Sequence, residues 1–168
     1  VEICKLRLFL KLAAQIERDE TLPNQGAEPL PDIDFNIFAG NALVGYATHA
    51  EALRAMRETV GGQGKLALEA TVDGVEERVR QVDEQFTAFR RAQLTTDAVI
   101  ENREKQRLQA ALRTLDDELN QYLAGEYGVE AHNESRFAAW REHHQPFHWF
   151  VKFYRVLQQH GGFDVVIG

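Results

Sequence analysis

The fold is decided by the segment Asp73-Gly-Val-Glu-Glu-Arg-Val-Arg-Gln-Val-Asp-Glu-Gln-Phe-Thr-Ala-Phe89, whose apolar residues recur at alternating steps of four and three from Val75 onward. This spacing is typical of the seam between two packed helices. A second run with the same steps consists of Leu108, Leu112, Leu115, Leu119 and Tyr122. Only a short break near 93–96 separates the two runs, so the pattern predicts an antiparallel helical hairpin over about residues 74–124.

The end of this hairpin nearest its loop is charged. Between Val99 and Leu108 the sequence reads Ile-Glu-Asn-Arg-Glu-Lys-Gln-Arg, and the apolar spacing lapses. A mixed-charge run is usually a solvated helix face and less often a surface for DNA or protein. We therefore expect Glu104 to contribute little to stability, and we expect the hairpin to be a spacer or domain contact rather than a direct DNA contact.

The composition is that of one globular domain, with 168 residues of which 44% are hydrophobic and 27% are charged. The net charge of −7 predicts a poor nucleic-acid binder unless the positive charges cluster on one face. The single cysteine, Cys4, excludes a disulfide framework and a cysteine-based zinc site. A reducing, cytoplasmic location fits this cysteine usage.

Residues 1–16 read as a helix with an unusually wide apolar arc. Lys5, Arg7 and Lys11 interrupt it, so it is no membrane span, and we expect no membrane partner. An arc of this width predicts that something large covers it. The chain also starts in mid-helix without an N-cap residue, which predicts an internal fragment of a longer protein.

Two strands are expected, one before and one after the hairpin. Ile33–Phe38 alternates apolar and polar residues, and a Gly40-Asn41 turn follows it. Loops at the carboxyl ends of strands often contact ligands in α/β sheets, although a plain strand and glycine turn would read the same way. The run Phe163-Asp-Val-Val-Ile-Gly168 suits the buried middle of a parallel sheet.

Local signals place three further helix starts. Thr48-His-Ala-Glu51 is a capping box for a helix that ends at Gly61-Gly62, and Asp73-Gly-Val-Glu76 is a second start of this kind. Gln145-Pro-Phe-His148 predicts the beginning of a helix over Trp149–Gln159.

Three histidines near the last helix, His143, His144 and His148, invite a metal interpretation together with Glu142. Adjacent histidines on a helix point about 100° apart, and Pro146 breaks the helix that could have aligned them. We therefore expect no metal site.

Three stretches together resemble one enzyme family. Phe147-His-Trp-Phe-Val-Lys-Phe-Tyr-Arg-Val156, followed by Gly161-Gly-Phe-Asp-Val-Val-Ile-Gly168, resembles the segment that leads into the Asn-Pro-Pro-Tyr motif of S-adenosylmethionine-dependent DNA adenine-N6 methyltransferases. Val1-Glu-Ile-Cys-Lys-Leu-Arg-Leu-Phe-Leu10 resembles their helix after the second cofactor-binding strand, and Pro31-Asp-Ile-Asp-Phe-Asn-Ile-Phe-Ala-Gly-Asn-Ala-Leu43 resembles their third motif. The combination is most similar to large single-chain type IIG restriction-modification enzymes and related phage-exclusion methyltransferases.

The resemblance implies a mainly α fragment (α+β), in which a long antiparallel helical hairpin is inserted into a partial doubly wound methyltransferase α/β domain. It implies cofactor contacts from Gly40 and Asn41. Asn41 stands where an acidic residue commonly accepts a hydrogen bond from the adenine amino group of S-adenosylmethionine, and an amide oxygen can accept the same bond.

The same resemblance implies which parts of the site lie elsewhere. The glycine-rich cofactor loop would precede Val1, and the catalytic motif would begin after Gly168. We therefore expect this chain to hold no catalytic residue, to bind no cofactor by itself and to be inactive alone. The intact protein would bind DNA and S-adenosylmethionine.

On this interpretation residues 1–46 belong to the methyltransferase core, residues 47–141 form a helical insertion, and residues 142–168 lead to the catalytic motif. The two expected strands would lack their neighbours, so we expect self-association through the strands and the first helix. The alternative, from a different class, is a freestanding helical hairpin module that binds other proteins. The sequence flanking this chain distinguishes the two.

Overall fold

A computed structural model describes residues 1–16, 21, 35–60, 65–94, 97–159 and 161–167. This part of the chain is mainly α-helical, as predicted. The chain divides into two compact units, Val1–Ala39 and Gly40–Gly168. The helices are α1 (Glu2–Ala13), α2 (His49–Val60), α3 (Lys65–Gln93), α4 (Ala98–Glu126), α5 (Glu134–His144), α6 (Trp149–Lys152) and α7 (Tyr154–Gln159).

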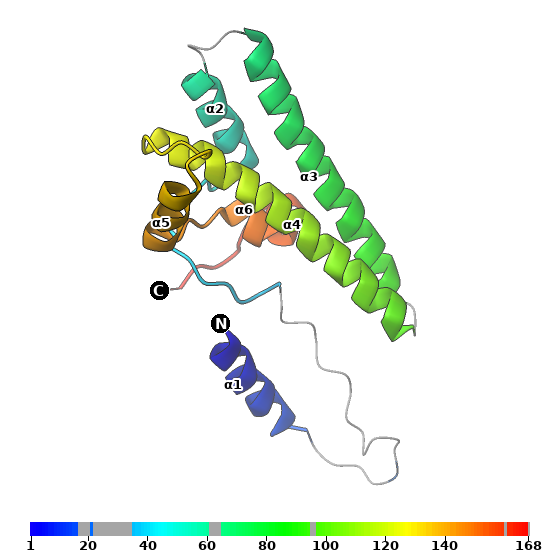
Figure 1. The fold of residues 1–168 in the computed structure, drawn as a ribbon. Coiled ribbons are helices and arrows are strands. Elements are labelled where there is room, and N and C mark those ends of the chain that lie inside the picture. Colours follow the sequence, from blue (N-terminus) through cyan, green and yellow to red (C-terminus); the bar gives the residue numbers. More distant parts are fainter. Residues whose placement is uncertain (17–20, 22–34, 61–64, 95–96, 160, 168) are drawn as a thin grey trace. The chain divides into compact units, whose positions relative to one another are not determined.

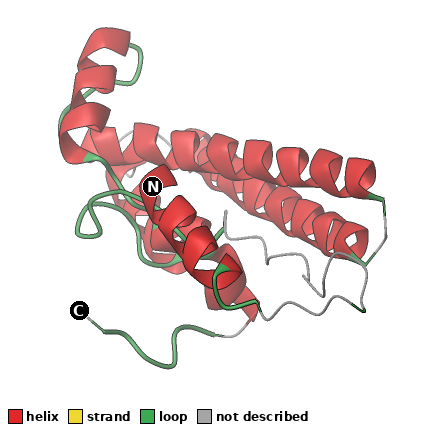
Figure 2. Cartoon of the chain, turned by 90° about the horizontal axis from the view of Figure 1, so that it is seen from below, coloured by secondary structure: helices red, strands yellow, loops and turns green. Residues whose placement is uncertain are grey.

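Helices α3 and α4 form the predicted hairpin. They lie side by side in two perpendicular views (Figure 1, Figure 2). The apolar seam between them is buried, which confirms the interpretation of the four-three spacing. Its buried members are Val75, Val82, Phe86 and Phe89 from α3 and Leu108, Leu115 and Leu119 from α4.

Helix α3 begins earlier than the sequence predicts. It starts at Lys65 and passes through Gly74, so Asp73-Gly-Val-Glu76 is not a helix start. Val72 is buried one turn before Val75, and this extends the seam toward the start of the helix. A glycine inside a helix costs about 1 kcal/mol, which the added packing offsets.

Helix α2 begins at the predicted capping box. The hydroxyl of Thr48 accepts a hydrogen bond from the N–H of Glu51 at 3.1 Å. The Glu51 carboxylate accepts from the N–H of Ala47 at 2.7 Å, one residue further back than in the usual box. The helix ends at Val60, and the predicted stop at Gly61-Gly62 lies outside the described residues.

Three consecutive acids on α4 each pair with a different helix. Successive residues on a helix point about 100° apart, so adjacent side chains reach neighbours on different sides. Helix α4 is therefore the element around which the second unit is assembled. The pairs are Asp116 with Lys152 of α6 at 2.8 Å, Asp117 with Arg141 of α5 at 3.0 Å, and Glu118 with Arg78 of α3 at 3.5 Å.

Glu104, on the charged end of the hairpin, is not a freely solvated residue. Its side chain is only 10% exposed, and its carboxylate accepts from Arg103 at 3.0 Å and from Arg107 at 3.1 Å. The hydrogen bond from Arg103 and the nearby Arg107 lower the pKa of Glu104. The expectation of a solvated face does not hold at this position.

The prediction of two strands is wrong for those of their residues that the structure describes. Phe35–Phe38 form a turn and irregular backbone, whereas Ile33 and Asp34 lie outside the described residues. Residues 163–167 are irregular, with Val165, Val166 and Ile167 exposed. A strand is stable only when a neighbouring strand satisfies its backbone, and within the described residues neither stretch forms a β-bridge.

The expected helix over Trp149–Gln159 is divided. Helix α6 ends at Lys152 and α7 begins at Tyr154, with Phe153 between them at φ −108° and ψ 38°, outside the helical region.

Helix α1 exposes its apolar arc, with Ile3 74% and Leu6 57% exposed. A covering surface for this arc and self-association through it stay predictions. None of the helices in the described part of the chain is both long and apolar enough to cross a membrane.

The seam gives a first testable prediction. Leu115 is fully buried, so Leu115→Ala should lower the free energy of unfolding by about 2–5 kcal/mol through lost burial and a residual cavity. Val99 on the same helix is 78% exposed, so Val99→Ala should change the free energy of unfolding by less than about 0.5 kcal/mol. Urea denaturation followed by circular dichroism measures both, and equal effects would contradict the seam.

Candidate functional site

The turn that carries Gly40 and Asn41 is paired with a segment far later in the chain. Residues 41–46 run parallel to residues 145–149, like two short irregular strands, with a bridge between Asn41 and Pro146. Backbone N–H groups donate in both directions across the pair. The bonds run from Asn41 to Gln145 at 2.7 Å, from Phe147 to Val44 at 2.6 Å and from Trp149 to Tyr46 at 3.0 Å.

Two glycines allow this close approach. A Cβ atom on Gly40 would lie 2.7 Å from the ring of Phe147. Gly45 has a φ of +142°, which other residues rarely adopt, and a Cβ there would collide with the carbonyl oxygen of Phe147. The turn is therefore pressed directly against the backbone and side chain of Phe147.

Gln145 directs the chain out of α5 and into this pairing. It adopts a left-handed conformation, with φ 47° and ψ 56°, at the end of the helix. Such a conformation costs a non-glycine residue about 1 kcal/mol or more, and Pro146 prevents the helix from continuing. The N–H of Gln145 is bound by the carbonyl of Arg141 at 2.9 Å, which helps to hold the strained residue.

His148 lies at the centre of the pairing and is fully buried. Its Nδ1 accepts from the N–H of Tyr46 at 3.1 Å, and its Nε2 lies 3.1 Å from Oδ1 of Asn120 on α4. Because Nδ1 accepts, Nε2 carries the proton and donates to Asn120. Burial lowers the pKa of His148 to about 4, so the imidazole is neutral at physiological pH.

Tyr46 continues this network to the end of α4. Its ring stacks on His148 with centroids 5.2 Å apart, and its hydroxyl donates to Glu126 at 2.7 Å. Burial, followed by this bond to Glu126, raises the pKa of Tyr46. With both imidazole nitrogens and the phenol hydroxyl engaged, the network fixes the turn and leaves neither ring free to act as an acid or a base.

Asn41, the predicted cofactor contact, is exposed at the tip of the turn. Its Oδ1 accepts from the N–H of Leu43 at 3.1 Å, which closes the turn locally. Gly40 lies beside it against Phe147. The structure thus brings the two predicted residues together with 145–149, although not through the strand that was expected to precede them.

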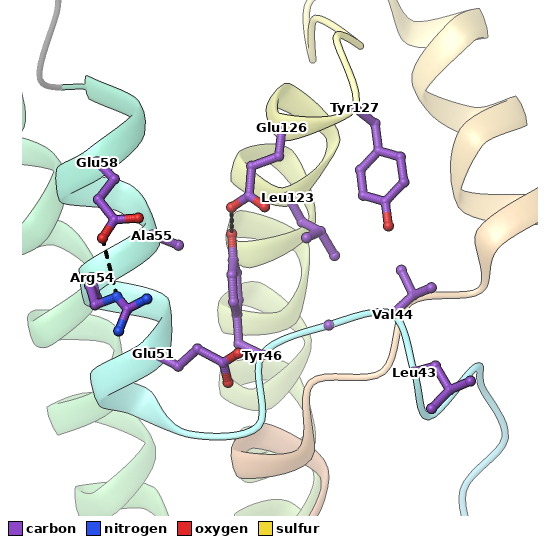
Figure 3. A pocket seen from close by; sticks show the side chains of 11 residues that line it. Leu43, Val44, Tyr46, Glu51, Arg54, Ala55, Glu58, Leu123, Glu126 and Tyr127 are labelled. Atoms are coloured by element: carbon purple, nitrogen blue, oxygen red, sulfur yellow. Dashed lines mark hydrogen bonds and ion pairs between the residues drawn. The ribbon is translucent and has the colours of Figure 1, made fainter.

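A pocket of about 260 Å³ lies beside the same turn (Figure 3). Its charged groups already have partners, because Arg54 pairs with Glu58 at 3.2 Å and Glu126 accepts from Tyr46. Gly40 and Asn41 are not among its lining residues, so the pocket and the predicted cofactor contact are separate features.

The histidines of the last region have different surroundings. His143 is exposed, and Nδ1 of His144 lies 3.0 Å from the carbonyl oxygen of Trp140. Within the part of the chain that the structure describes, no three His, Cys, Asp or Glu side chains form a group that could hold a metal.

Sequence reasoning missed the polar network of the buried residues Tyr46, Asn120 and His148, which ends at the exposed Glu126. The sequence held no usable signal for Asn120, because each seam leucine of α4 is followed by a polar residue. Its partner His148 lies on a segment with no periodic relation to the hairpin, so their contact could not be predicted from spacing.

No family model, curated protein or solved structure matches this chain.

The buried imidazole predicts a pH dependence. The pKa of His148 is about 4 in the folded chain and ordinarily 6.5, so the unfolded chain binds more protons between these values and stability falls as the pH decreases. Between pH 7 and 5 this effect should remove about 2 kcal/mol. In His148→Gln this part of the pH dependence should be lost, whereas in His132→Gln, at an 81% exposed side chain, it should remain. Identical pH profiles of urea midpoints for native protein and His148→Gln would refute the assignment.

The close approach at Gly45 predicts a second effect. Gly45→Ala should prevent the pairing of 41–46 with 145–149 and lower the melting temperature strongly, because the new methyl group meets the Phe147 backbone. Gly162 is a matched control, since its φ is +141° and nothing lies within 4 Å of an added Cβ. Gly162→Ala should therefore show only the conformational cost of about 1 kcal/mol. Equal losses would mean that the collision is absent.

Proposed function

We propose that the chain is part of an S-adenosylmethionine-dependent DNA adenine-N6 methyltransferase, and that residues 47–141 are a helical insertion in its catalytic domain. The proposal starts from the three stretches whose sequence resembles this family. A partial doubly wound α/β domain that carries the hairpin is part of the same proposal.

One observation supports this proposal most. Residues 40–43 of the turn end the stretch that resembles the third motif, and residues 147–149 open the stretch that resembles the approach to the catalytic motif. The two are hydrogen-bonded to each other although the whole hairpin separates them in sequence. An insertion must leave and re-enter its host domain at neighbouring points, and this pairing is what that requirement predicts.

The state of Asn41 also supports the proposal. Its amide is exposed, and its oxygen, which accepts one bond from Leu43, can accept a second. The turn is held by His148 and by the contact of Gly40 with Phe147, so little conformational entropy remains to be lost when a ligand binds. We propose that Asn41 accepts a hydrogen bond from the adenine amino group of the cofactor.

The proposed reaction asks little more of this chain. When bound, the cofactor supplies a methyl group from its sulfonium to the amino nitrogen of an adenine flipped out of the DNA. Such a transfer depends chiefly on positioning, and the contribution we assign to these residues is to hold the turn in place.

The first functional prediction concerns the 168-residue chain alone. One candidate contact at Asn41 cannot supply the several that a cofactor requires, so we expect no adenine methylation and no tight cofactor binding. Isothermal titration with S-adenosylmethionine tests this expectation. A dissociation constant of about a micromolar or lower would contradict it.

The second concerns a longer protein that includes the flanking sequence. We expect an Asn-Pro-Pro-aromatic motif directly after Gly168, a glycine-rich loop before Val1, and methylation of adenine in DNA. Asn41→Ala should then weaken cofactor binding by about 1–2 kcal/mol, the usual cost of one hydrogen bond to a polar ligand. Asn102→Ala, at an exposed position on α4, is the control and should leave the affinity unchanged.

Two outcomes would count against this proposal. Unchanged cofactor affinity in Asn41→Ala would remove Asn41 from the site. Absence of both flanking motifs would refute the methyltransferase and favour a hairpin interaction module.

A further inference from the structure

Two segments of this acidic chain contain no acid. No Asp or Glu occurs between Gln85 and Thr96 or between His143 and Phe163. The first segment contains the end of α3, and the second contains α6 and α7. They meet in the folded chain because the ring of Tyr154 stacks on that of Phe86, with centroids 6.0 Å apart.

Tyr154 anchors α7 on α3 at this contact. It is 4% exposed, and its hydroxyl donates to the carbonyl of Val79 at 3.5 Å. Burial, and then the nearby Asp83 carboxylate, raises the pKa of Tyr154 to about 12, so the phenol stays neutral. The following residue, Arg155, is exposed to solvent beside the end of α3.

A pocket of about 410 Å³ lies at this junction and is lined by three arginines. Its lining residues are Arg90, Arg91 and Arg155 with Thr87, Gln93 and Leu94, and they include no carboxylate. No carboxylate of the described segments forms an ion pair with any of the three arginines. Carboxylates pair with Arg54, Arg78, Arg80, Arg103, Arg107 and Arg141, whereas among the described residues Arg57, Arg113 and Arg136 have no such pair either. The pocket differs from these positions in that three arginines gather there.

Helix stability explains only part of this cluster. Arg90 and Arg91 are in the last turn of α3, where positive charge interacts favourably with the helix dipole. Arg155 comes from another helix, and a third like charge beside them costs free energy unless an anion compensates it.

We propose that this pocket binds a phosphate group of the DNA backbone. The choice of DNA as the source of the phosphate rests on the proposed function. Guanidinium groups bind phosphate oxygens through paired N–H donors, and Thr87 and Gln93 add neutral ones. Leu94, which is 89% exposed, offers an apolar surface to the sugar. Because a phosphate contact carries no sequence information, its role is to fix how the DNA lies relative to the catalytic domain.

The net charge of −7 does not prevent this interaction. At about 0.1 M salt, charges more than about 10 Å away are largely screened, so the net charge of the whole chain does not decide binding at the pocket. The net charge predicts a poor nucleic-acid binder unless positive charges cluster, and the three arginines of this pocket form such a cluster.

The test compares two triple variants of the 168-residue chain with equal net charge. One is Arg90→Gln, Arg91→Gln, Arg155→Gln, and the control is Arg57→Gln, Arg113→Gln, Arg136→Gln, at exposed positions outside the pocket. Fluorescence anisotropy measures binding of a short DNA duplex between about 0.05 and 0.2 M salt. The pocket variant should bind about tenfold more weakly, and its log–log salt slope should fall by about one for each lost contact. The control should stay within about threefold of the native chain.

Three results would overturn the proposal. Equal losses in the two variants would mean that only long-range charge matters, and no binding by the native chain at about 0.05 M salt would mean that there is no DNA site. Inorganic pyrophosphate is the second probe, followed by NMR of the arginine side chains. If pyrophosphate shifts the three arginines while the duplex binds native chain and pocket variant equally, the pocket serves small phosphates and not DNA.

The experiment is separable from the test of the proposed function. It measures DNA binding by this chain and not methyl transfer. If the pocket variant binds the duplex as tightly as the native chain, the prediction that the longer protein methylates adenine is not affected. If that protein fails to methylate adenine while the pocket still binds the duplex, the proposed methyltransferase function is refuted and the proposed phosphate site is retained.

Discussion

The second unit depends on one buried, neutral imidazole. His148 accepts from the backbone of Tyr46 on one side and donates to Asn120 on the other, so a turn, a long helix and the final segment share one residue. Burying a polar ring without both bonds would cost several kcal/mol, and this penalty selects the single arrangement in which both are made. The glycines at 40 and 45 and the strained Gln145 follow from it, because each lets the two segments approach closely enough for the ring to reach both partners.

This arrangement bears on the proposed methyltransferase, because the insertion is then not a passive addition. Asn120 and Glu126 lie on α4, within the proposed insertion, and they hold His148 and Tyr46, which belong to the proposed host. The turn with Asn41 is therefore positioned by the hairpin. If the arginine pocket at the end of α3 binds backbone phosphate, the hairpin also connects DNA to that turn through one continuous set of packed helices.

The parts of the fold that could be predicted are those fixed by local repetition. The four-three spacing from Val75 to Tyr122 is a property of neighbouring turns, so it identified the hairpin, and the capping box at Thr48 identified the start of α2. The strands at 33–38 and 163–167 could not be assigned in this way, because a strand requires a partner that the pattern itself does not specify. The bond between His148 and Asn120 and the meeting of Arg155 with Arg90 and Arg91 join distant segments. Of the candidate site, only the turn at Gly40 and Asn41 was accessible from sequence.

The three ion pairs made by the consecutive acids Asp116, Asp117 and Glu118 restrict how the length of the hairpin can change in evolution. Each acid reaches its basic partner only at one rotation of α4 about its axis. Gain or loss of a single residue between Leu108 and Asp116 would rotate the three acids and Asn120 by about 100° relative to the seam residues before them. Insertion of two helical turns, about seven residues, at facing positions of α3 and α4 brings the side chains almost back to their original rotation. Related proteins should therefore differ in hairpin length in steps near seven residues, or by changes confined to the loop between α3 and α4. The length of the hairpin would then vary among relatives, while the part of α4 that carries the three ion pairs and Asn120 stays constant.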